Sequence, residues 1–249
     1  MAKIAFITGG TGGIGFQTAL KFGRMGYTVL INGIDDAQIA NADKVLTEEK
    51  IEHEIFKWDV TKEDQIVAGF NKVKEKYDHL DVLVNNAGGL GGRRRFEVMD
   101  TEFYRFVLAL NVDSAVFATR ECIPLLRKGT DASIINFASN AAYNGGGPGA
   151  GIYGASKAAI VTLTRAMAKD LAEYGIRVNA VSPGTIDTPF HDATKKANPA
   201  LFESWKKNIL MKRFGQPEEV ANVIYFLCSD QASFLTGEIV QINGGQDLL

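Results

Sequence analysis

The chain has 249 residues, of which 46% are hydrophobic and 22% charged, and its formal net charge is -2. This is the composition of a globular protein with enough apolar residues for a large core, and no basic excess favours nucleic acid or an anionic membrane as a partner. No apolar run reaches the roughly 20 residues of a membrane span. The first residues enter a strand pattern directly, without the pattern of a signal peptide, so we expect a cytoplasmic protein.

The cysteines and histidines of the chain give no sign of a metal site. Cys122 and Cys228 lie far apart in apolar helical patterns, which favours buried free thiols over a disulfide. The histidines, at positions 53, 79 and 191, form no cluster with cysteines or carboxylates at metal-ligand spacing. We therefore expect no metal.

Short apolar runs alternate along the chain with longer segments of helical period. The expected strands are residues 3–7, 28–32, 54–59, 82–85, 133–138, 177–181 and 239–242. The expected helices are residues 13–25, 36–49, 62–77, 100–127, 153–174 and 217–229. This order predicts a single α/β domain, with a doubly wound, Rossmann-type parallel sheet and helices on both faces. Residues 185–213 fit the alternation poorly, and we expect an insertion that covers the substrate at the carboxyl edge of the sheet.

The turn between the first strand and the first helix reads TGGTGGIG, from Thr8 to Gly15. A glycine-rich turn at this place lets a pyrophosphate approach the backbone, and the helix amino terminus offers free N–H groups and a positive dipole end. The spacing is TGxxxGxG and differs from the common GxGxxG. The position of the turn therefore carries the prediction of a dinucleotide site, and a plain tight turn is the alternative.

A tyrosine and a lysine four residues apart, Tyr153 and Lys157, share one face of the predicted helix 153–174. A nearby cation favours the phenolate and brings the pKa of the phenol from about 10 toward neutrality, as a general acid or base requires. Ser139 follows a predicted strand, where its hydroxyl can bond a reacting carbonyl oxygen. Such a pair also occurs by chance on amphipathic helices, so it needs support.

Further motifs stand in the same order along the chain: NNAG at 85–88, Pro183-Gly184 with Thr188, and QINGG at 241–245. Together with the glycine turn, Ser139 and the Tyr153–Lys157 pair, they make the chain resemble the short-chain dehydrogenase/reductase family over essentially its whole length. The resemblance implies an NAD(P)(H)-dependent oxidoreductase that interconverts a carbonyl and an alcohol. It also implies a homotetramer in which the helices at 100–127 and 153–174 pack between subunits.

The resemblance assigns roles to matching residues. Tyr153 is the expected catalytic acid/base, Lys157 lowers its pKa and holds the nicotinamide ribose, Ser139 polarises the carbonyl, and Asn111 helps to retain a relay water. A buried asparagine bonded to backbone is the alternative for Asn111. Besides Tyr153 and Lys157, the expected cofactor contacts are Gly9, Gly13, Ile14, Gly15, Asp59, Val60, Asn85, Ala87, Gly88, Pro183, Gly184, Ile186 and Thr188.

The choice of cofactor depends on the end of the second strand, VLINGIDDAQ. Family members that use NAD often place an acidic residue where this chain has Gly33, and users of NADP often carry arginine where it has Ile34. Asp35 and Asp36 come slightly later, and we assign both to the cofactor site. With two carboxylates and no cation nearby, NAD(H) is favoured over NADP(H). Capping of the next helix is the alternative role for both residues.

The substrate is expected to be a small molecule that contacts residues of two loops. Arg93, Arg94 and Arg95 lie on a glycine-rich loop after the fourth strand, and arginine binds carboxylates through paired N–H donors. His191 lies in the insertion, with an exposed loop histidine as the alternative. A solvated charge run is the alternative for the arginines.

Three functions follow from these motifs. The first is reduction of an anionic keto sugar acid, since this loop is similar to that of the family branch that reduces keto-deoxy uronates. The second is a 3-oxoacyl carrier-protein reductase, in which the arginines meet an acidic carrier protein. The third, a non-catalytic dinucleotide sensor, is disfavoured by the intact Ser139, Tyr153 and Lys157.

Overall fold

The computed structural model describes residues 2–248, and within them the chain forms a parallel seven-stranded sheet. The strands are β1 (Ile4–Ile7), β2 (Thr28–Gly33), β3 (His53–Lys57), β4 (Val82–Asn85), β5 (Ser133–Phe137), β6 (Arg177–Pro183) and β7 (Ile239–Ile242). Their order is β3-β2-β1-β4-β5-β6-β7, so the order reverses between β1 and β4. In such sheets, ligands bind beyond the carboxyl ends of the strands at this reversal.

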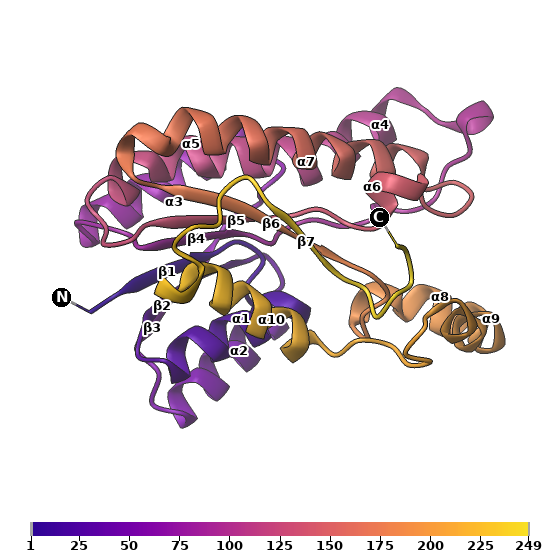
Figure 1. Ribbon diagram of the computed structural model, residues 1–249, viewed down its shortest axis with the longest axis horizontal. Helices are drawn as coiled ribbons and strands as arrows, with labels where there is room; N and C mark the ends of the chain where they lie inside the picture. Colours follow the sequence, from indigo (N-terminus) through magenta and orange to yellow (C-terminus); the bar gives the residue numbers. More distant parts are fainter. Residues whose placement is uncertain (1, 249) are drawn as a thin grey trace.

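Helices cover both faces of the sheet (Figure 1). One face carries α1 (Gly13–Arg24), α2 (Asp36–Glu48) and α10 (Pro217–Cys228); the other carries α3 (Glu63–Lys76), α4 (Thr101–Leu108), α5 (Ser114–Leu126) and α7 (Gly151–Leu171). Three short helices, α6 (Ala141–Asn144), α8 (Asp192–Ala197) and α9 (Pro199–Ser204), follow the carboxyl ends of β5 and β6. The predicted doubly wound α/β domain is confirmed.

The inner strands are buried on both faces because helices cover both sides. Every residue of β1, β4 and β5 is buried, which explains why these strands are mainly apolar; their polar residues are Asn85, Ser133 and Asn136. On the face that carries α3, the ring of Phe6 packs on those of Trp58 and Phe70, with centroids 5.7 and 4.8 Å away. On the other face, Phe22 meets Tyr225 edge to face at 5.5 Å.

The helix expected over residues 100–127 is interrupted. After α4 the chain makes a π-helical turn, Ala109–Asp113, before it continues as α5. The Asn111 side chain accepts a hydrogen bond from Gly89 N (3.0 Å) and donates to Gly89 O (2.9 Å) and Val107 O (3.0 Å). The extra residue of a π-turn is a frequent feature of functional sites, and here it joins the helix to the loop after β4.

Residues 185–213 fold into α8, α9 and the 3-10 turns Pro189–His191 and Trp205–Asn208. They enclose a small apolar cluster of Phe202, Ile209 and Phe214. Two lysines lie over rings of this cluster: Lys195 Nζ is 5.3 Å from the centre of the Phe202 ring, and Lys206 Nζ is 4.8 Å from that of Phe214.

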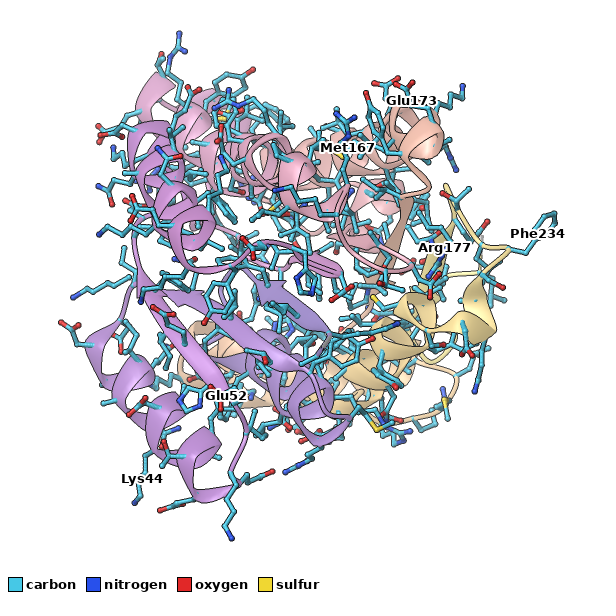
Figure 2. The ribbon with its side chains drawn as sticks, turned by 90° about the vertical axis from the view of Figure 1, so that its left-hand side faces the viewer. Lys44, Glu52, Met167, Glu173, Arg177 and Phe234 are labelled. Atoms are coloured by element: carbon cyan, nitrogen blue, oxygen red, sulfur yellow. The ribbon has the colours of Figure 1, made fainter. Side chains whose placement is uncertain are left out.

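Two features lie away from the carboxyl edge. Cys122 and Cys228 are buried free thiols, as predicted. Phe234, in the loop before β7, is fully exposed and projects from the molecule in Figure 2. Across the described residues 2–248, no helix is both long and apolar enough to cross a membrane.

Candidate active site

A cleft of about 1860 Å³ lies at the carboxyl edge of the sheet. Its walls come from the β1–α1 turn, the ends of β2, β4, β5 and β6, the start of α7, and the segment from Thr188 to Asn208. The predicted site residues that line it are Gly9, Gly13, Ile14, Asp35, Asp59, Val60, Ala87, Gly88, Arg93, Ser139, Tyr153, Lys157, Pro183, Gly184, Ile186, Thr188 and His191. Those outside its lining are Gly15, Asp36, Asn85, Arg94, Arg95 and Asn111.

The glycine turn presents bare backbone to this cleft. Gly9 and Gly13 have φ angles of +61° and +52°, which glycine adopts without the strain of a side chain. A Cβ at Gly13 would meet only Thr188, at 3.9 Å, so the space above it is open. Gly12 gives α1 no side-chain cap, and the first turn has no acidic residue. The free N–H groups and positive end of α1 therefore suit a pyrophosphate.

Gly15 and Asn85 support the turn from inside. A Cβ on Gly15 would overlap the carbonyl oxygen of Gly9 and the Asn86 amide, and that amide donates to the carbonyls of Thr8 and Gly9 at 3.0 and 2.9 Å. Asn85 lies in the core, where it donates to Thr119 (3.0 Å). Both residues support this edge of the cleft and lie outside its lining.

Tyr153 and Lys157, in the first turns of α7, are brought beside Ser139, which follows β5. Lys157 Nζ donates to the carbonyl of Phe137 at 2.8 Å and lies 5.8 Å from the centre of the Tyr153 ring. Ser139 Oγ donates to Asn140 Oδ1 and accepts from Ala141 N, both at 3.2 Å. Three of the four predicted catalytic side chains, Ser139, Tyr153 and Lys157, thus line one end of the cleft.

Burial sets the protonation of this pair. It raises the pKa of Tyr153 above its ordinary value of 10, although a hydrogen bond with Ser139 acts in the opposite direction. Burial also lowers the pKa of Lys157 to about 8. In the free protein desolvation outweighs the hydrogen bond with Ser139, so the pKa of the phenol moves away from neutrality. At neutral pH, tyrosine keeps its proton and lysine its charge.

Asn111 and Lys157 flank the NNAG loop. A Cβ on Gly88 would lie 2.8 Å from Asn111 Oδ1 and 3.2 Å from Lys157 Nζ. Because the Asn111 side chain is buried and bonded to the backbone of Gly89, the structure gives it a positioning role in this loop. That agrees with the alternative considered for it from the sequence.

Within residues 2–248, no cation lines the part of the cleft beside Asp35. Asp35 caps α2 by accepting from Gln38 N at 2.8 Å, and it also lines the cleft. Asp36 lies outside the lining and pairs with Lys57 at 2.5 Å. Among the described residues, the cations that line the cleft are Arg93 and Lys157, both at its other end.

The absence of an acidic residue at position 33 has a steric reason. A Cβ on Gly33 would lie 2.5 Å from both Oγ1 and Cγ2 of Thr11. Thr11 therefore occupies the space that a carboxylate at the end of β2 would need. Both residues, with Gln38 and Asn41, line this part of the cleft with neutral groups.

One arginine of the three lines the cleft. Arg93 lines the cleft and donates to Pro148 O at 3.0 Å. Arg94 lies outside, with its guanidinium 5.6 Å from the centre of the Phe103 ring, and Arg95 is exposed. All three arginines are exposed, and a run of three does not reveal which one lines the cleft.

His191 is packed among aromatic rings and is not an exposed loop residue. Its ring lies 5.0 Å from that of Phe190, 5.5 Å from Phe202 and 5.7 Å from Trp205. Burial, assisted by the charge of Lys195, lowers the pKa of His191 to about 4. It is therefore a neutral imidazole in the cleft at physiological pH.

Sequence reasoning missed several lining residues. They are Asn140, Phe190, Trp205 and Gln246. Gln246, near the carboxyl terminus, accepts from Thr185 N (2.8 Å) and Thr185 Oγ1 (3.1 Å). A polar residue directly after Ser139 was the available signal for Asn140.

Comparison with known proteins identifies the family of the chain. The sequence model of the enoyl-(acyl carrier protein) reductase family matches residues 9–247. The chain is 37% identical over 243 residues to the 3-oxoacyl-[acyl-carrier-protein] reductase FabG of Thermotoga maritima. This alignment covers 98% of this chain and 97% of that protein.

Solved structures agree as well. The NADH-dependent reductase A1-R' responsible for alginate metabolism is 36% identical, with a TM-score of 0.89 over 100% of this chain and 98% of that one. A short-chain dehydrogenase/reductase from Brucella melitensis, titled glucose/ribitol dehydrogenase, is 32% identical, with a TM-score of 0.90 over 99% and 97%. The chain belongs to the short-chain dehydrogenase/reductase family, and it is an oxidoreductase that acts on CH–OH or C=O groups with NAD(P).

The cost of burying Lys157 predicts a pH-dependent stability. Between pH 8 and its ordinary pKa of 10.5, the folded lysine is neutral while the unfolded one is charged, so the free energy of unfolding rises with pH across this window. Below pH 8 the Lys157→Met variant should be more stable than the wild type by up to about 3 kcal/mol. Urea unfolding of both proteins should show this difference shrinking as pH rises through the window. A difference independent of pH would contradict the prediction.

Proposed function

We propose that the protein reduces a ketone carbonyl with NADH, with Tyr153 as proton donor. The observation that carries the proposal is the convergence of Ser139, Tyr153 and Lys157 on the cleft that the glycine turn also faces. The open space above Gly13 and the uncapped amino terminus of α1 fit a dinucleotide at the opposite end.

The nicotinamide cofactor, when bound, supplies the hydride. The Tyr153 phenol donates its proton to the carbonyl oxygen, since its raised pKa keeps it protonated at neutral pH. The Ser139 hydroxyl donates to the same oxygen and polarises the carbonyl. Lys157, charged below about pH 8, stabilises the phenolate that remains.

The preference for NADH is supported by the adenosine end of the cleft. A 2′-phosphate there would meet the Asp35 carboxylate and no cation, whereas a ribose hydroxyl can donate to that carboxylate. The similar reductase from alginate metabolism is named as NADH-dependent.

The part of the cleft near Arg93 and His191 supports an anionic keto sugar acid as the substrate class. Arg93 offers donors to a carboxylate, the neutral His191 offers an N–H group, and Phe190 and Trp205 form an apolar wall. The name of the similar reductase A1-R', which mentions alginate metabolism but no substrate, supports a role in sugar-acid metabolism.

A 3-oxoacyl group on an acidic carrier protein is the second candidate. The names of the curated relatives from Thermotoga maritima and Aquifex aeolicus support it better than they support a sugar acid. Arg94 and Arg95, exposed outside the cleft, would then face the carrier protein.

Turnover of a carbonyl panel by the wild type and Tyr153→Phe tests the reaction. The panel contains a keto-deoxy uronate, acetoacetyl thioesters, a neutral sugar and simple ketones. We expect the variant to lose about 10²- to 10⁴-fold in kcat, because it lacks the transferable proton, and to keep its affinity for NADH. A variant with most of the wild-type rate would refute the assigned proton donor.

Removal of the Asp35 charge should relax the choice of cofactor. Asp35→Ser keeps an oxygen that can cap α2 and should tighten NADPH binding roughly three- to tenfold relative to NADH. Asp36→Ser is the matched control, because Asp36 lies outside the cleft. Dissociation constants from nucleotide fluorescence provide the measurement, and equal effects of the two substitutions would argue against a role for Asp35.

Substitution of Arg93 and of Arg94 distinguishes the two proposed substrate classes. For a keto sugar acid, Arg93→Gln should raise KM roughly tenfold or more by removing a charged donor, while Arg94→Gln and the kinetics of a neutral ketone should change little. Greater sensitivity of a carrier-protein thioester to Arg94→Gln would favour the second candidate. Steady-state kinetics of both variants on both substrates give the answer.

A further inference from the structure

The end of the chain reaches the side chain next to Ser139. Asp247 Oδ2 accepts a hydrogen bond from Asn140 Nδ2 at 2.8 Å, and its Oδ1 accepts from Asn144 Nδ2 at 3.1 Å. In Figure 1 the carboxyl-terminal segment accordingly ends beside α6. Asn140 in turn accepts from Ser139 Oγ at 3.2 Å, so a continuous line of hydrogen bonds joins Asp247 to Ser139.

The carboxylate determines which way the Asn140 amide faces. An ionised carboxylate only accepts hydrogen bonds, so the NH₂ group of Asn140 must point toward Asp247. The amide oxygen then points toward Ser139 and can accept its proton. Ser139 Oγ also accepts from Ala141 N at 3.2 Å, which leaves the hydroxyl few other orientations.

Other contacts hold this part of the chain without the Asp247 side chain. The backbone carbonyl of Asp247 accepts from Asn243 Nδ2 at 2.8 Å, and Gln246 is bonded to Thr185. Asn144 contacts the same carboxylate but belongs to no hydrogen bond with Ser139. The effect of the Asp247–Asn140 hydrogen bond can therefore be measured separately from the anchoring of the carboxyl-terminal segment.

We propose that Asp247 is a positioning residue for the proposed reaction, on which this inference rests: through Asn140 it orients the Ser139 hydroxyl. In the free protein, Asn140 holds the Ser139 proton. When a carbonyl oxygen enters, that proton turns to it from a fixed starting orientation. Without the carboxylate the amide can flip and donate to Ser139 Oγ, and the Ser139 proton then turns fully to the Tyr153 oxygen, with which Ser139 already interacts in the free protein, before substrate arrives.

A double-mutant cycle tests the path. Asp247→Ala should lower kcat roughly tenfold, less than the loss of a direct donor costs, with the affinity for NADH and the melting temperature near those of the wild type. In a Ser139→Ala background the same substitution should have no further effect on kcat. Asn144→Ala, the matched control, should stay near the wild-type rate. Additive losses, or equal losses in Asn144→Ala, would overturn the proposal.

Titration of Tyr153 tests the orientation without any substrate. The tyrosinate ultraviolet signal, taken as a difference from Tyr153→Phe, should show a lower pKa in Asp247→Ala, because the Ser139 proton is then free to stabilise the phenolate. Asp247→Asn removes the charge but keeps an oxygen for Asn140, so it should cause a smaller shift. Equal shifts in the two variants would reduce Asp247 to a remote charge and overturn the proposal. Failure of the proposed function instead appears as no carbonyl turnover by the wild type.

Discussion

The structure depends on the burial of a lysine ammonium beside a tyrosine phenol at the carboxyl edge of the sheet. Lys157 is 4% exposed, and Phe137 O is the one hydrogen-bond partner of its ammonium among the described residues. Burial at this place works against the folded state, since it lowers the pKa of the lysine to about 8. The same burial keeps the phenol protonated. The folded protein is thus less stable at the place where a proton donor, Tyr153, and a cation, Lys157, must lie together near neutral pH.

Polar contacts in the core allow this arrangement. Asn85 and Asn136 join β4 to β5 through a 2.9 Å hydrogen bond, and Asn136 donates to Thr164 of α7 at 3.0 Å. These buried bonds fix α7 against the sheet, because an unpaired amide in the core would be costly. They thereby set where Tyr153 and Lys157 lie relative to the loop after β5. Residues that the family resemblance placed at the cofactor edge, such as Asn85, act on the site from behind.

The sequence predicts the sheet well because most strands are mainly apolar and β3 is the exception. It predicts the cleft because the glycine turn, Ser139 and Tyr153 all follow or face strand ends. It does not reveal the π-turn or the short helices α6, α8 and α9, which span too few residues to show a period. The hydrogen bonds from Asp247 to Ser139 include one between Asn140 and Asp247, which are 107 positions apart in the sequence, so no local sequence pattern indicates them. The burial of His191 likewise depends on rings scattered along the insertion.

The pH dependence of carbonyl reduction tests the central claim most directly. If the buried lysine supports a protonated tyrosine, kcat with saturating NADH should be level at neutral pH and should fall as Lys157 loses its charge above about pH 8. A rate that rises through this range would mean that the reaction requires the deprotonated form of the pair, and it would contradict the account of Tyr153 as proton donor with Lys157 as its charged partner.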